Sequence, residues 1–101
     1  MAKVITLINR DKKKCRCGSW LNHWLNFSNQ TVGHCVVNYC LNRKLIGAHV
    51  KKANSYDNNE YIIPICVEHS KMEGIFEING AIKLVSANVS NTCERKNIDF
   101  I

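Results

Sequence analysis

The sequence has little proline and no long apolar run. Pro64 is the single proline, and 46% of the 101 residues are hydrophobic against 22% charged. This balance excludes wholesale disorder, because a chain with this apolar content can bury a core. No apolar stretch approaches the roughly 20 residues that a membrane-spanning helix needs. We therefore expect a globular chain without a membrane partner.

The sequence also has no visible secretory signal, repeat or linker. The apolar run 4–8 is too short for a signal peptide, and a polar, basic stretch follows it. We therefore expect a cytoplasmic location, where cysteine thiols stay reduced. A chain of this length, with neither repeat nor linker, is predicted to form one domain over residues 1–101.

Acidic residues are scarce. Eight Asp and Glu stand against 14 Lys and Arg, which gives a net charge of +6. A basic surface favours a polyanionic partner, nucleic acid first, although a solvated basic face explains the same charge. No arginine-rich block or RNA-binding aromatic motif accompanies it, so a protein partner also stays open. The basic residues gather at 12–16, 43–44, 51–52 and 95–96.

Cysteine, by contrast, is abundant. Six cysteines and four histidines occur in this short chain. Such a set either forms a disulfide framework or binds metal. The expected reducing location and the accompanying histidines favour Zn²⁺ over disulfides.

Two pairs of metal-ligand residues bracket a predicted hairpin. Cys35 and Cys40 have the spacing of a knuckle, a tight turn whose backbone N–H groups point at the sulfurs and lower the thiol pKa. Cys66 and His69 begin a predicted short helix, 66–72, and project to the same side of it. Three thiolates and one imidazole form a closed set, which is typical of a structural zinc site.

A second set of three cysteines and one histidine remains. Cys15, Cys17, His23 and Cys93 are predicted to bind a second zinc ion, which would join the two ends of the chain. The alternative is that Cys93 is a small buried hydrophobe and His23 a surface histidine. His34, beside the first knuckle cysteine, is an alternative ligand. One or two zinc ions are therefore expected.

The order of elements predicts an α+β fold. Ser19 is the expected N-cap of a short N-terminal helix. Trp20, Trp24 and Phe27 share one face of that helix, and we expect them to pack in the core, with nucleic-acid stacking as the alternative. Knuckle, hairpin and ligand-bearing helix together have the layout of a small zinc-stapled treble clef. Strands are predicted at 3–8, 45–50 and 60–65, and a further hairpin joins 75–78 to 81–85 through Asn79-Gly80.

The segment from Gly47-Ala48-His49-Val50 to Tyr61-Ile62-Ile63-Pro64-Ile65-Cys66-x-x-His69 resembles the HNH endonucleases, the ββα-metal or His-Me finger family. In that family a histidine ends the first strand, a hairpin returns through an Ile-Pro-Leu-Cys-like segment, and a helix follows. Many members carry a structural zinc on two cysteine pairs. The resemblance covers residues 35–72, and the flanks 17–24 and 84–93 are similar to small uncharacterised bacterial and phage HNH-like proteins.

The resemblance implies roles for particular residues. His49 would be the general base that deprotonates the water attacking a phosphodiester, with Mg²⁺ or Mn²⁺ neutralising the leaving oxygen. The sequence departs from the family at Ala48, where an acidic or histidine ligand is expected, and at Ser70, where a histidine or asparagine usually stands. The asparagine of the family's hairpin would come from 57–59.

These departures favour a zinc-stabilised binding module on a degenerate HNH-like scaffold, which binds nucleic acid or a protein. A metal-dependent endonuclease with His49 as its base is the first alternative. A phage-type protein that inhibits a host defence protein by binding it is the second. The three differ in chemistry, since fold alone does not decide function.

Overall fold

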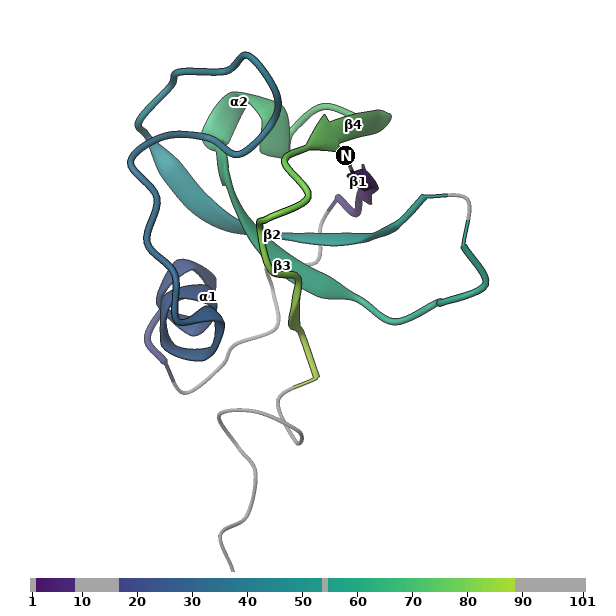
Figure 1. The fold of residues 1–101 in the computed structure, drawn as a ribbon, viewed down its shortest axis with the longest axis horizontal. Coiled ribbons are helices and arrows are strands. Elements are labelled where there is room, and N and C mark those ends of the chain that lie inside the picture. The colour runs from purple at the N-terminus through teal and green to yellow at the C-terminus, as the bar shows by residue number, and fades with distance from the viewer. Residues whose placement is uncertain (1, 9–16, 54, 89–101) are drawn as a thin grey trace, which may run out of the picture.

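The computed structural model describes residues 2–8, 17–53 and 55–88, which form an α+β fold (Figure 1). The predicted class is thus confirmed. The helix after Ser19, the strand near the amino terminus and the two strands of the central hairpin are confirmed as well. The elements in chain order are β1 (Ala2–Thr6), α1 (Trp20–Ser28), β2 (Leu45–Lys52), β3 (Tyr61–Cys66), α2 (Val67–Ser70), β4 (Ile75–Ile78) and β5 (Val85–Ser86).

The strands form one antiparallel sheet in the order β4-β1-β2-β3-β5. β2 and β3 are its central hairpin, in which Leu45 lies opposite Cys66 and Val50 opposite Tyr61. β1 lies between β2 and β4. In Figure 1 this long, twisted hairpin crosses the molecule, and its loop extends away from the other elements.

The predicted hairpin between 75–78 and 81–85 is wrong. β4 pairs with β1 and β5 pairs with β3, so the two segments lie at opposite edges of the sheet. Asn79 does make a turn, because its Oδ1 accepts a hydrogen bond of 2.8 Å from the N–H two residues on. Beyond the turn the chain is held by α1, where the indole N–H of Trp24 donates to the carbonyl of Lys83 at 2.8 Å. Side-chain hydrogen bonds from Trp24 and Gln30, rather than pairing with β4, hold residues 81–83.

Both faces of the central hairpin are covered. Successive residues of a strand point to opposite faces, and the apolar run Ile62-Ile63-Pro64-Ile65 is buried throughout. On one face Ile62 packs against Trp20 and Trp24 of α1. The opposite face carries the larger core, which is made of Val4, Cys35, Val36, Val37, Ala48, Val50, Ile63, Ile65, Cys66 and Ile78.

Helix α1 begins as its sequence predicts. The Ser19 hydroxyl accepts a hydrogen bond of 3.1 Å from the N–H of Asn22, which satisfies one of the free donors of the first turn. Trp20 and Trp24 are buried, so their predicted core role is confirmed, whereas Phe27 is 42% exposed. Neither described helix is long and apolar enough to cross a membrane.

The start of α1 crosses β2 at Gly47. A Cβ atom at this position would lie 2.2 Å from the backbone carbon of Trp20 and 2.4 Å from the backbone nitrogen of Leu21. Real Cβ contacts are not this short, and backbone atoms cannot rotate away as a side chain can. The glycine therefore sets how closely helix and sheet approach each other.

Candidate metal centre

A tight knuckle carries the first two predicted ligands. The N–H of Cys35 donates to the carbonyl of Asn42 at 2.8 Å, and the N–H of Val36 donates to the carbonyl of Pro64 in β3 at 3.2 Å. Tyr39 closes the turn with a left-handed backbone, φ 68°, which is uncommon for a residue with a side chain. The first bond closes the loop on itself, and the second fixes the knuckle to the sheet.

The end of β3 and the single turn of α2 carry the other two ligands. Cys66 is the N-cap of α2, and its Sγ accepts a hydrogen bond of 3.4 Å from the N–H of His69. The N–H of Val67 donates to the carbonyl of Lys44 at 3.1 Å, which ties α2 to the start of β2. The His69 ring packs edge-on against Phe76 of β4, with 5.2 Å between the ring centroids. Both ligands are therefore held by neighbouring elements.

The four donor atoms of Cys35, Cys40, Cys66 and His69 lie within 4.8 Å of one another. The Sγ of Cys35 is 3.6 Å from Nδ1 of His69, and the Sγ atoms of Cys40 and Cys66 are 3.9 Å apart. The shortest separation, 3.1 Å, joins Cys66 Sγ to His69 Nδ1. Tetrahedral zinc, with bonds of about 2.3 Å to sulfur and about 2.1 Å to nitrogen, places two sulfurs about 3.8 Å apart and sulfur and nitrogen about 3.6 Å apart. The cluster has the donor types and spacing to hold a metal ion.

Burial distinguishes two of the three cysteines, Cys35 and Cys66, from reactive surface thiols. Cys35 and Cys66 are 0% and 1% exposed. Desolvation raises the pKa of the Cys35 thiol to about 12, although backbone N–H groups of Cys66 and Val37 lower it. The N–H groups thus act in the predicted direction on Cys35, but desolvation of the buried thiol outweighs them. A bound cation would supply the charge that a buried thiolate needs beside it.

The four described cysteines, Cys17, Cys35, Cys40 and Cys66, are free thiols. The 3.9 Å between the Sγ atoms of Cys40 and Cys66 is nearly twice the length of a disulfide bond, about 2.05 Å. Within the described residues the preference for metal over disulfides therefore agrees with the structure.

The second predicted site is described only in part, because Cys15 and Cys93 lie outside the described residues. The Sγ of Cys17 is 3.8 Å from Nδ1 of His23. His23 is fully buried, so the alternative interpretation of a surface histidine is wrong. In the described ranges, the first predicted site is where three or more possible metal ligands come together.

The remaining histidines lie apart from this centre. His34 is exposed, and its Nδ1 is 2.9 Å from the carbonyl oxygen of Cys35, so its ring is engaged outside the group of four. His49 lies on β2, is 3% exposed, and packs edge-on against Trp20 with 4.5 Å between the ring centroids. A general base must come within hydrogen-bond reach of the proton it removes. In this arrangement the His49 ring faces α1.

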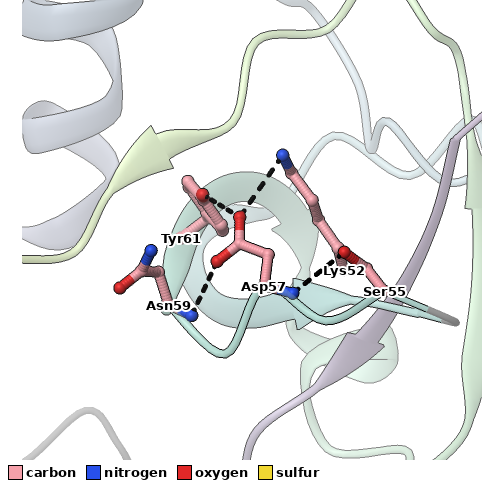
Figure 2. A network of polar contacts seen from close by, with 5 residues as sticks. All are labelled: Lys52, Ser55, Asp57, Asn59 and Tyr61. Carbon is pink, nitrogen blue, oxygen red and sulfur yellow. Dashed lines mark hydrogen bonds and ion pairs between the residues drawn. The ribbon is translucent and has the colours of Figure 1, made fainter.

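The β2–β3 loop is organised around the Asp57 carboxylate (Figure 2). The Tyr61 hydroxyl donates to Oδ2, the backbone N–H of Asn59 donates to Oδ1 at 2.9 Å, and the Lys52 ammonium lies 3.4 Å from Oδ2. The Tyr61 hydrogen bond lowers the pKa of Asp57 and raises the pKa of Tyr61. The resemblance would draw the asparagine of the family's hairpin from residues 57–59. Within that range, Asp57 stabilises the turn.

Two contacts that orient the histidines were not predicted. Phe76 supports His69 from β4, and the carbonyl of Ser86 in β5 accepts a hydrogen bond from Nε2 of His23 at 2.8 Å. The alternation of Phe76 and Ile78 marks a strand but not its neighbours. A backbone carbonyl leaves no signal in the sequence, so the Ser86 contact becomes visible only once the strands are paired.

No family model, curated protein or solved structure matches the chain. The resemblance of residues 35–72 to HNH endonucleases therefore stays a prediction. The donor atoms, their burial and the charge of the chain are what point to a function.

Proposed function

We propose that the chain is a zinc-stabilised nucleic-acid-binding module on a treble-clef, HNH-like scaffold. The convergence of Cys35, Cys40, Cys66 and His69 on one point carries this proposal. Knuckle, hairpin and helix follow one another as in a treble clef, with a ligand pair at each end. Three thiolates and one imidazole select Zn²⁺ over Mg²⁺ or Mn²⁺, which prefer oxygen ligands.

The zinc would have a structural role. Four protein ligands complete a tetrahedral ion and leave no position for water or substrate. The ion would connect the knuckle, the end of β3 and α2, in addition to the backbone hydrogen bonds and the core packing of Cys35 and Cys66. In small domains of this kind, metal binding contributes a large part of the folding free energy, about 10 kcal/mol or more in zinc-finger peptides.

The charge of the chain supports nucleic acid as the partner. The net charge is +6, and residues 10–16 alone hold five basic residues and one acidic residue. Lys3, Arg43 and Lys44 add exposed cations within the described ranges. Lys and Arg side chains neutralise phosphates and release condensed counterions, so a surface of this kind binds nucleic acid without needing base contacts.

The first experiment measures affinity against salt. Fluorescence anisotropy with a short labelled duplex DNA should show binding that weakens as salt rises. If about four phosphates are neutralised, a fourfold rise in salt lowers the affinity by about 100-fold. A Lys12→Gln, Lys13→Gln, Lys14→Gln variant should lower the slope of that dependence, whereas replacing the same three lysines by arginine should preserve it. An affinity that does not change with salt concentration, or no binding at all, contradicts the nucleic-acid proposal and favours a protein partner.

The nuclease alternative can be tested with the same preparation. Plasmid DNA is incubated with Mg²⁺ or Mn²⁺ and either the original chain or His49→Ala. We expect no difference in DNA cleavage between the two proteins, because the His49 ring is buried against Trp20. Cleavage by the original chain, lost in the variant while the zinc content and fold are retained, would replace the binding module with an HNH-type nuclease.

A further inference from the structure

We propose that Cys17 and His23 bind a second zinc ion, at a site separate from the Cys35, Cys40, Cys66 and His69 centre. His23 is a buried polar group. His23 lies on α1 with 0% of its surface exposed, between the rings of Trp20 and Phe27, whose centroids are 5.0 and 5.2 Å from that of His23. A polar ring in an apolar setting needs partners for its nitrogens.

One nitrogen of His23 is assigned by its partner. Nε2 lies 2.8 Å from the carbonyl oxygen of Ser86 in β5. A carbonyl oxygen only accepts hydrogen bonds, so Nε2 carries the proton and a neutral ring has its lone pair on Nδ1. Histidines that bind zinc commonly donate their other N–H to a carbonyl or carboxylate, which fixes the ring and makes the ligating nitrogen more basic. His23 has this arrangement.

The lone pair of His23 faces a thiol. Nδ1 is 3.8 Å from the Sγ of Cys17. Sulfur and nitrogen ligands on one tetrahedral zinc lie about 3.6 Å apart. In the first centre, Nδ1 of His69 lies 3.6 Å from the Sγ of Cys35 and 3.1 Å from the Sγ of Cys66. The Cys17–His23 pair therefore presents the same atom types at a separation close to that of the Cys35–His69 pair.

Cys17 is held in position by its surroundings. Its carbonyl accepts a hydrogen bond of 3.2 Å from the side-chain amide of Asn22 on α1. Gly18 follows with a positive φ of 91°, which turns the chain from Cys17 into the helix that Ser19 caps. The thiol and the imidazole are thus brought together by the geometry of the helix start.

Two ligands do not complete a zinc site, and the sequence contains two further cysteines. Cys15 and Cys93, which lie outside the described residues, are the partners that the sequence predicts. Within the described residues, Cys17 and His23 would supply two of the ligands.

The test counts zinc ions per chain by elemental analysis, on protein purified without added metal. We expect two ions in the original chain and one in Cys17→Ser, whose half-exposed position leaves the core intact. His34→Ala is the matched control, a change at a histidine outside both sites, and should keep two ions. One ion per chain that survives in Cys17→Ser but is lost in Cys66→Ser would overturn the second site and leave the first standing. No zinc at all would overturn both.

Cadmium NMR resolves the sites separately. The cadmium-loaded chain should give two metal resonances, and Cys17→Ser should lose one of them while retaining the other. Coupling of the lost resonance to His23 Nδ1 is the expected signature, whereas coupling only to His69 would contradict the proposal. The same spectra of Cys15→Ser and Cys93→Ser decide whether these residues complete the site.

Discussion

At the scale of single residues, Gly47 is the glycine, of the five in the chain, at which a side chain would meet backbone atoms. It lies where the backbone of α1 meets β2, and a methyl group there would overlap backbone atoms of Trp20 and Leu21. The same strand presents His49 to the Trp20 ring two residues later. The position of α1, and with it the surroundings of His49, therefore depends on the absence of one side chain.

Gly47→Ala should destabilise the fold by about 3 kcal/mol, since overpacking against backbone atoms can be relieved only by moving the helix. Urea denaturation of the zinc-loaded protein measures the change. Gly33→Ala is the matched control, because a Cβ atom there meets nothing within 4 Å, and a surface substitution of this kind changes stability by about 0.5 kcal/mol or less. Equal stability of the two variants would mean that α1 does not approach β2 this closely.

Asp57 and Tyr61 form a pair whose ionisation is linked. The pKa of Tyr61 is raised above its ordinary value of 10.0, first by the hydrogen bond to Asp57. A group with a raised folded-state pKa stabilises the fold below its unfolded pKa, and this contribution is lost as the pH rises through the folded value. For Asp57, whose pKa is lowered from 3.8, the contribution is present above that value and is lost as the pH falls.

Asp57→Asn should therefore lower the pKa of Tyr61, because the carboxylate acceptor is removed. A pH titration of the Tyr61 ring signals by NMR measures the shift. Asn58→Ala, a neighbouring change that keeps the carboxylate, should leave the titration of Tyr61 as it is in the original chain. An unchanged Tyr61 titration in Asp57→Asn would show that the two side chains do not interact in solution.

At the scale of elements, a metal ion at the candidate centre would join two segments that have little stability alone. α2 is a single turn, and isolated helices of this length do not form in water. The knuckle and the residues that lead from it to β2 contain no helix or strand. Their one isolated bridge pairs Val37 with Ile78. Shared ligation would bind both to the end of β3, so we expect these elements to depend on the metal more than the sheet does.

Cys66→Ser should release the zinc of this centre and expose the knuckle and α2 to solvent. Hydrogen exchange is the measurement, with the amides of Val36, Asn38 and Val67 as reporters, because their hydrogen bonds connect the knuckle to β3 and β4 and connect α2 to the residue before β2. Faster exchange at these amides than in the middle of β2 is the expected pattern. Ser70→Ala, on the same helix but without a ligand, should keep both zinc and protection. Retention of zinc in Cys66→Ser would remove that thiol from the ligand set.

At the scale of the whole molecule, the sequence predicts elements better than it predicts their neighbours. The N-cap at Ser19, the apolar run of β3 and the ligand spacings are local patterns, and each reappears in the structure. The partners of β4 and β5 were not predictable, because Asn79-Gly80 marks a turn without stating where the chain goes next. In the structure this segment is hydrogen-bonded to Trp24 of α1 and to Gln30, which lie more than fifty positions earlier in the sequence.

The candidate site likewise has features that local sequence predicts and features that depend on distant parts of the chain. The spacing of Cys35, Cys40, Cys66 and His69 could be read from the chain because zinc ligands come in short-range pairs. The burial of His23 could not, since the helical pattern puts it on the flank of the apolar face. β5 covers that flank, and β5 pairs with a strand more than thirty positions away from His23 in the sequence.

The place of β1 within the sheet has a kinetic consequence. β1 lies between β2 and β4, yet Ala2 pairs with Ile78 and Val4 with Lys52, so its neighbours come from much later in the chain. β2 and β3 can pair through a short loop and should form early, because closing a short loop has a small entropic cost. Long-range pairing is slow. As the chain is synthesised, the strand made before its partners must wait for them, and the nascent sheet keeps an open edge on β2 until β1 closes it.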